Sequence, residues 1–243
     1  MSRHAGAPKR RTKTSAGGRK RRSEWAAEFH PGPRLGPGMT SASPRQLRKA
    51  IAAFDPDRPW AELRDGIRPM LPRLRPMPFA TDEPVRVMLP PGILVGFGLD
   101  LGPALAQVGP PLLDRWRITT DELAAVALGN VRRLAATCKS SIVVRNPIGS
   151  IDVSALQTRL GIAASLLLVP DQLPRFFGTE PGLLLAPMRD LILRLPADAD
   201  LFDAAWLAEE FESMDPNCLH LGAFAWDGID VRPVALEPVA ARA

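Results

Sequence analysis

Short turns separate most of the strand-like runs in this chain, and this spacing limits how its strands can pair. The clearest case is CLHLGAFAW, an Asp227-Gly228 turn and IDVRPV. SIVVRN and IDVSALQ likewise flank a turn at 147–149, and two apolar half-strands in GLLLAPMRDLILRLP flank residues 187–190. Strands joined by such short turns run antiparallel, because a parallel crossover needs about a dozen residues or more. With helical segments between the hairpins, the sequence predicts an α+β fold, a mostly antiparallel sheet packed against several helices.

Three further strand-like runs stand earlier in the chain: VRVML, ILVGFGLDL and ALAQV. The second run contains Gly96-Phe97-Gly98, which resembles the beginning of a phosphate-binding loop. The next glycine of that pattern falls at 102, and no helix is expected to open there, so the match is poor. Glycines inside a strand more often mark a bulge or a close approach of another backbone, and we expect one of these here.

The predicted helices are defined by their caps and by proline. Ser43 followed by Pro44 is a typical N-cap and first-turn pair, and predicts a helix ending near 55–57. Residues 59–63 predict a shorter helical segment, which the prolines at 69, 72, 76 and 78 break. The run LLLVPDQLPRFFG predicts a short strand or loop and then a helix ended by Gly178. Asp200 is expected to cap the last helix.

We divide the chain into four parts. They are a disordered basic tail over 1–38, a helical N-terminal element with a proline-rich hinge over 39–78, an α+β domain over 79–237, and a second tail over 238–243.

The basic tail carries the positive charge of the whole chain. Ten Lys and Arg residues against two acids give residues 1–38 a net charge of +8, whereas the other 205 residues carry −3. A segment this basic and this poor in apolar residues is expected to be disordered. An alternative is that the native protein starts at Met39, which TSASPRQLRKAIAAF follows. Nucleic-acid binding, or binding to an acidic surface, is expected only through the tail's two clusters. Their residues are Lys9, Arg10, Arg11, Arg19, Lys20, Arg21 and Arg22.

An asparagine interrupts the apolar stripe of the most clearly patterned helix, predicted over 120–138. Thr119 or Thr120 caps it, and acids fill its first turn. At 100° per residue, Asn130 falls near the middle of the apolar arc and Arg132 lies opposite. A buried amide needs hydrogen-bond partners. We therefore interpret Asn130 as a core residue that ties the helix to a neighbouring backbone, with a ligand contact as the alternative.

Residues for cofactor or metal chemistry are scarce in the chain. His220 is the only histidine beyond residue 30, and Cys218 is its one soft neighbour, on the same side of an expected strand. Zinc sites need three or four ligands, so we expect no metal, and no motif indicates a cofactor. A nucleophilic pair of Cys138 with His220 is a further hypothesis, but most buried cysteines are inert.

The expected location is the cytoplasm. The two cysteines suit reduced, buried thiols, and the basic N-terminal stretch lacks the apolar segment of a secretory signal. The longest apolar runs are far shorter than the roughly 20 residues that span a bilayer. We therefore expect no membrane association.

Four sequence patches follow one another within roughly 85–235. They are DLG with LLDRWRITTDELAAVALGNVRRL, then AASLLLVPDQL, LLLAPMRDLILRLP and LGAFAWDGIDVRPV. In this order they resemble the YtpQ-like family of bacterial domains of unknown function. The resemblance implies an α+β domain, a cytoplasmic setting and no established activity. In that family the second patch usually has an arginine after the serine, and often an aspartate and a tyrosine before it. Here those places hold Leu166 and residues 161–163.

The candidate ligand or partner residues are Asn130, Arg132, Ser165 and Asp190, and no catalytic residue is assigned. Asp190 is expected to turn the chain between two half-strands and to accept backbone N–H groups. The favoured function is a non-enzymatic binding or scaffold module with an unknown protein partner. The alternative is an enzyme of unrecognised type, for example a hydrolase using Asp190 with Asn130 or Ser165. It requires these side chains to converge in an exposed pocket.

Overall fold

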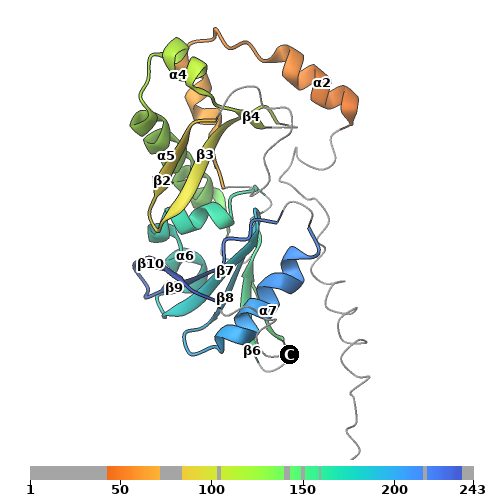
Figure 1. The fold of residues 1–243 in the computed structure, drawn as a ribbon, viewed down its shortest axis with the longest axis vertical. Helices are drawn as coiled ribbons and strands as arrows, with labels where there is room; N and C mark the ends of the chain where they lie inside the picture. The colour runs from red at the N-terminus through yellow and green to blue at the C-terminus, as the bar shows by residue number, and fades with distance from the viewer. Residues whose placement is uncertain are drawn as a thin grey trace, which may run out of the picture. The chain divides into compact units, whose positions relative to one another are not determined.

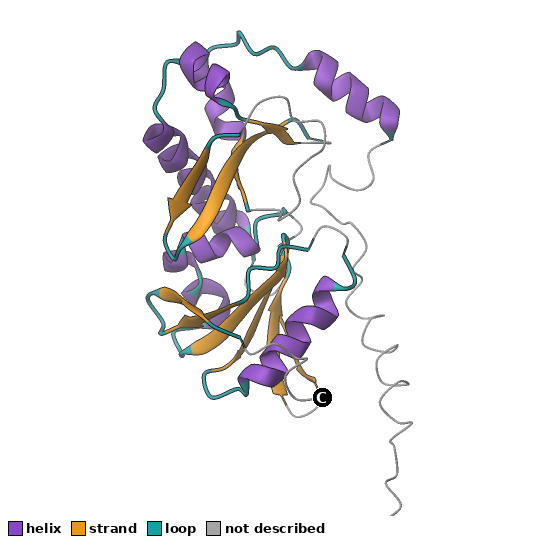
Figure 2. Cartoon of the chain, in the orientation of Figure 1, coloured by secondary structure: helices purple, strands orange, loops and turns teal. Residues whose placement is uncertain are grey.

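The computed structural model describes residues 43–71, 84–102, 105–139, 143–148, 151–158, 160–215 and 218–236 (Figure 1). The basic tail with its seven candidate residues, the alternative start at Met39, most of the proline-rich hinge and the 238–243 tail lie outside these ranges. The described residues form helices and two antiparallel sheets, drawn in purple and orange in Figure 2, which confirms the α+β class. None of the described helices is both long enough and apolar enough to cross a membrane.

The first sheet is built around its longest strand, β3 (Ile93–Asp100). Three strands pair with β3, all antiparallel: β1 (Ile67–Met70), β2 (Arg86–Leu89) and β4 (Leu105–Gln107). The three strand-like runs predicted over 85–108 are β2, β3 and β4, so that prediction is confirmed.

Strand β1 falls inside the 39–78 segment that the sequence predicted to be helical with a hinge. Its third residue, Pro69, pairs with Phe97 of β3. Proline cannot donate a ladder hydrogen bond and is tolerated at a sheet edge, and β1 is such an edge strand. The local sequence around Pro69 therefore predicts the end of a helix, whereas pairing with β3 makes the segment a strand.

Of the two glycines in Gly96-Phe97-Gly98, Gly98 is the one that close packing inside β3 requires. A Cβ atom on Gly98 would lie 2.7 Å from the sulfur of Met70 and 3.2 Å from the Cβ of Leu105. The strand continues to Asp100 without opening a helix. The sequence predicted a bulge or a close approach of another backbone, whereas the close contacts at Gly98 are with side chains of the neighbouring strands. Because no helix opens after the glycines, the segment is not a phosphate-binding loop.

The second sheet has six strands in the order β10-β9-β7-β8-β6-β5, all antiparallel. Its three hairpins are those predicted from the turn spacing. Their strands are β5 (Val143–Ile148) with β6 (Ile151–Leu156), β7 (Gly182–Met188) with β8 (Leu191–Pro196), and β9 (Ala223–Trp226) with β10 (Val231–Val234). Every residue of β7 is buried, which accounts for the unbroken apolar run in the sequence.

The predicted helix caps are present. Ser43 and Gln46 form a capping box at the start of α2 (Pro44–Ala53). The Thr119 hydroxyl accepts a hydrogen bond from the Glu122 N–H at the start of α5 (Thr120–Thr137). Asp200 caps α7 (Leu201–Glu212) through the Phe202 N–H. The shorter segments are α3 (Trp60–Leu63), η1 (Arg64–Gly66) and α4 (Pro110–Trp116), which was not predicted.

The run LLLVPDQLPRFFG contains no strand. It forms η3 (Ala164–Leu168), η4 (Pro170–Gln172) and α6 (Pro174–Phe177), and Gly178 ends the last of these as expected. The five residues of η3 are all buried, so η3 has no exposed polar face from which its helical turns could be recognised. Buried residues of both sheets, α5 and this run belong to one hydrophobic core.

Candidate functional site

Asn130 ties α5 to the chain segment that leads into the first sheet. Its side chain is 5% exposed. The Nδ2 atom donates to the carbonyl oxygens of Arg64 at 2.7 Å and Ile67 at 2.9 Å, and Oδ1 accepts from Nη2 of Arg133 at 2.9 Å. Both amide hydrogens are therefore used by the backbone. The interpretation of Asn130 as a core residue bound to a neighbouring backbone is confirmed.

Arg132 lies on the exposed side of α5, as the helical period predicted. Its guanidinium forms a two-pronged ion pair with Asp171 of η4, with nitrogen to oxygen distances of 3.1–3.2 Å. Both side chains are about half exposed. Partial burial raises the pKa of Asp171, but hydrogen bonds from Arg132 and Gln172 outweigh it and hold that pKa below its ordinary value. The pair is a surface link between α5 and η4.

Replacing Arg132 with alanine should lower the free energy of unfolding by less than about 1 kcal/mol at neutral pH, because exposed ion pairs contribute little. The pKa of Asp171 is lower in the folded protein than in the unfolded chain. The ion pair therefore contributes to folding stability above the pKa that Asp171 has in the unfolded chain. This contribution is lost as the pH falls through the pKa that Asp171 has in the folded protein. Urea unfolding of both proteins at neutral pH and in acid checks this. A difference that grows in acid would contradict it.

Asp190 shapes the loop that follows β6. It is 8% exposed and lies in the turn between β7 and β8. Its Oδ1 accepts hydrogen bonds from the Thr158 hydroxyl and from the Ala163 N–H at 3.4 Å. The same hydroxyl accepts from the N–H groups of Leu160 and Ile162. The prediction that Asp190 turns the chain and accepts a backbone N–H is confirmed.

Ser165 lies in η3 and is 3% exposed. It borders a small cavity of about 20 Å³, whose other polar side chains are Arg68, Asp100 and Arg189. A space of this size holds about one water molecule. It is too small for an organic substrate.

The four candidate residues are not brought together in one pocket. Asn130 bonds to residues 64–67, Arg132 to Asp171, and Asp190 to residues 158–163. Ser165 is close to Asp190, since the N–H of its neighbour Ala164 donates to the Arg189 carbonyl oxygen at 3.0 Å. Neither Asn130 nor Asp190 lines the cavity beside Ser165.

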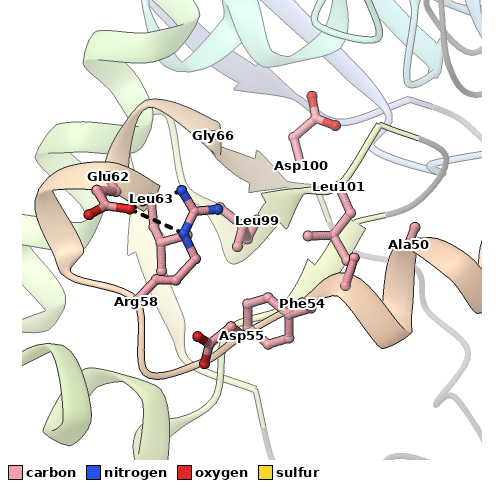
Figure 3. A pocket seen from close by; sticks show the side chains of 11 residues that line it. Ala50, Phe54, Asp55, Arg58, Glu62, Leu63, Gly66, Leu99, Asp100 and Leu101 are labelled. Atoms are coloured by element: carbon pink, nitrogen blue, oxygen red, sulfur yellow. Dashed lines mark hydrogen bonds and ion pairs between the residues drawn. The ribbon is translucent and has the colours of Figure 1, made fainter.

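A larger cavity of about 310 Å³ opens elsewhere, where the end of α2 faces α3 and the end of β3 (Figure 3). We call it the α2 groove. Apolar side chains form much of its lining, and charged groups stand among them. The lining residues are Ala50, Ala53, Phe54, Asp55, Arg58, Glu62, Leu63, Gly66, Leu99, Asp100 and Leu101. Its walls come from two segments about 35 residues apart, so no local sequence pattern indicated it.

The α2 groove has an excess of negative charge, three carboxylates against one guanidinium. Arg58 and Glu62 form an ion pair at 3.0 Å, visible in Figure 3. Asp55 accepts the N–H of Asp57, and Asp100 accepts the N–H of Gly102 and lies 3.7 Å from Arg68. Asp57 and Arg68 are not lining residues. The groove is therefore suited to an apolar group that carries positive charge beside it.

The two described cysteines differ in surroundings, and both are thiols. Cys138 is buried at the end of α5, and burial, aided by the Asp190 carboxylate, raises the pKa of its thiol. Cys218 and His220 do not lie on a strand as expected, because β9 begins only at Ala223. The nitrogens of His220 face Cys218 and Glu212. The hypothesis of a Cys138–His220 pair is therefore wrong, and His220 pairs with Cys218.

No protein-family model, no curated protein and no solved structure matches this chain.

Proposed function

We propose that this protein is a non-enzymatic binding module and that the α2 groove receives a peptide segment of a partner protein. The observation that carries the proposal is the groove itself, a 310 Å³ cavity with an apolar lining and an acidic excess. The polar residues of the alternative hydrolytic site are buried, and Asn130 and Asp190 form hydrogen bonds to other parts of the chain. This supports the module over the hydrolase that would use Asp190 with Asn130 or Ser165.

The proposed occupant is an apolar side chain next to Lys or Arg. A cavity of about 310 Å³ is at the lower end of the range for small-molecule sites and suits one or two large side chains. Carboxylates near an apolar contact attract basic partners and repel acidic ones.

Membership of the YtpQ-like family and a cytoplasmic location are parts of the same proposal. They are supported by the order of the four sequence patches and by the pattern of cysteine use. Neither assigns a chemical activity to the chain, which agrees with a binding role.

The proposal is tested by selecting peptides from a random displayed library on the full-length protein. We expect the selected peptides to share an aromatic or aliphatic residue beside Lys or Arg. Ala53→Arg should weaken their binding by about tenfold or more, because it places a like charge and a large side chain at the groove. Ala53 is exposed at the end of α2, and arginine is a good helix former, so the fold should persist.

Ala52→Arg is the matched control. It adds the same charge to the same helix at an exposed position that does not line the groove. We expect peptide affinity within about twofold of the wild type, since surface changes away from a contact have small effects. The proposal would be overturned if both variants changed peptide affinity equally, or if neither variant changed it. It would also be overturned if no peptide were selected.

A further inference from the structure

Three chemically active side chains meet where α7 ends. Glu212 is the last residue of α7, and Cys218 and His220 lie in the segment before β9. Leu219, between the last two, is 2% exposed, and its N–H donates to the carbonyl oxygen of Pro187 in β7 at 2.9 Å. This anchors the segment to the second sheet. His220 stays exposed beside the anchored Leu219.

The imidazole of His220 stands between a thiol and a carboxylate. Its Nε2 lies 2.9 Å from Sγ of Cys218, and its Nδ1 lies 2.5 Å from Oε2 of Glu212. A carboxylate only accepts hydrogen bonds, so it selects the tautomer with the proton on Nδ1. Nε2 is then an acceptor facing the thiol. A nucleophile, a base within hydrogen-bond reach and a third group that orients the base are the parts of an activated nucleophile.

The backbone at His220 supports this arrangement. Its φ of 52° lies in the left-handed region, which few residues other than glycine adopt and in which histidine is enriched. Unfavourable backbone conformations of this kind concentrate at functional sites. The side chain of Glu212 is 12% exposed, and that of His220 is 51% exposed. The carboxylate is thus shielded from water, while the imidazole is open to solvent.

We propose that Cys218 is a reactive thiol, with His220 as its base and Glu212 as the positioning residue, and that it is oxidised by small hydroperoxides. Nε2 of His220 takes the thiol proton. The sulfur then attacks one peroxide oxygen, and the O–O bond breaks. The departing oxygen takes the proton from Nε2 and leaves as water, or as an alcohol from an organic hydroperoxide. Sulfur is oxidised to sulfenic acid, and the peroxide is reduced.

The surroundings favour a small oxidant over a large substrate or a metal ion. Cys218, His220 and Glu212 line neither the α2 groove nor the cavity beside Ser165. A hydroperoxide needs no large binding cleft. The thiol and the carboxylate face different nitrogens of one ring, so these groups do not converge on a single point. Within the described ranges, no group of three or more His, Cys, Asp and Glu side chains has the arrangement of a metal site.

The test follows sulfenic acid formation at each cysteine of the reduced full-length protein. Hydrogen peroxide is the probe, dimedone traps the product, and peptide mass mapping separates Cys218 from Cys138. We expect Cys218 to be trapped about tenfold faster than glutathione at the same neutral pH, because a neighbouring histidine increases the thiolate fraction. Cys138 should react more slowly than glutathione, since it is buried and its thiol pKa is raised.

Two variants separate the base from its positioning residue. Asparagine also adopts the left-handed backbone conformation, so His220→Asn should leave the fold in place. It should slow the oxidation of Cys218 about tenfold without changing the oxidation rate of Cys138. Glu212→Gln should move the pH at which Cys218 becomes half thiolate upward, as measured by the ultraviolet absorbance of the thiolate. Glu209→Gln is the matched control, because it removes an exposed carboxylate from the same helix. It should leave both cysteines unchanged.

The proposal fails if Cys218 reacts no faster than glutathione, or if His220→Asn leaves its rate unaltered. It also fails if Glu209→Gln shifts the thiolate absorbance as much as Glu212→Gln does. That result would mean that the thiolate fraction of Cys218 responds to any negative charge on α7, and not to the contact between Glu212 and His220.

Discussion

Replacing Trp226 with alanine should lower the free energy of unfolding by about 3–5 kcal/mol, the largest effect that we expect from a single substitution in this chain. Trp226 ends β9 and is 1% exposed. Its ring meets that of Phe177 edge to face, with the centroids 6.5 Å apart. Truncation removes this contact and leaves a cavity in the core shared by the second sheet and α6.

Urea unfolding measures this effect, and thermal unfolding should show a lower midpoint, by about 2–4 °C per kcal/mol for a domain of this size. Ile229→Ala is the control. Ile229 lies in the turn after β9 and is 76% exposed, so its loss should change stability by no more than about 0.5 kcal/mol. Similar losses from both variants would mean that the β9–β10 hairpin is not packed as described.

Asn130→Leu should lower the free energy of unfolding by about 1–3 kcal/mol, because the leucine side chain branches at the same atom but cannot form hydrogen bonds. The carbonyl oxygens of Arg64 and Ile67 would lose their side-chain donor, and Arg133 would lose an acceptor. We expect the midpoint of urea unfolding to fall with little change in its slope, since the area exposed on unfolding stays similar.

The neighbouring residue supplies a control of opposite sign. Gly129 is exposed in the middle of α5, and an added Cβ would meet no atom within 4 Å. Gly129→Ala should therefore raise stability by about 0.5–1 kcal/mol through the unfolded chain and helix propensity. If Asn130→Leu instead kept wild-type stability and abolished peptide binding, Asn130 would be a functional residue, and the structural interpretation would be wrong.

Local signals were sufficient for much of the second sheet and for the long helices. Turn spacing defined the β5–β6, β7–β8 and β9–β10 hairpins, because a short turn leaves antiparallel pairing as the only geometry. Caps and period defined α2, α5 and α7 and placed Asn130 inside the apolar stripe. These features depend on residues within one turn or one element of each other, and the sequence carries them directly.

The sequence also showed that Asn130 needs partners but not which ones. Those partners are 63 and 66 positions away along the chain. Similarly, Pro69 indicated a break at the place where β1 forms, because pairing with β3 overrides the local preference. The buried run of η3 had no exposed polar face that could reveal its helical turns.

Residue patterns along the chain are enough to predict the α+β class, the antiparallel hairpins, the capped helices and the buried position of Asn130. The two places where we propose function depend instead on tertiary packing. The α2 groove joins the end of α2 to the end of β3, and the Cys218 site joins the end of α7 to the segment before β9. Both depend on where separate elements end after packing. Side-chain periodicity reports the buried face of one element and contains no information about which element will lie beside its end.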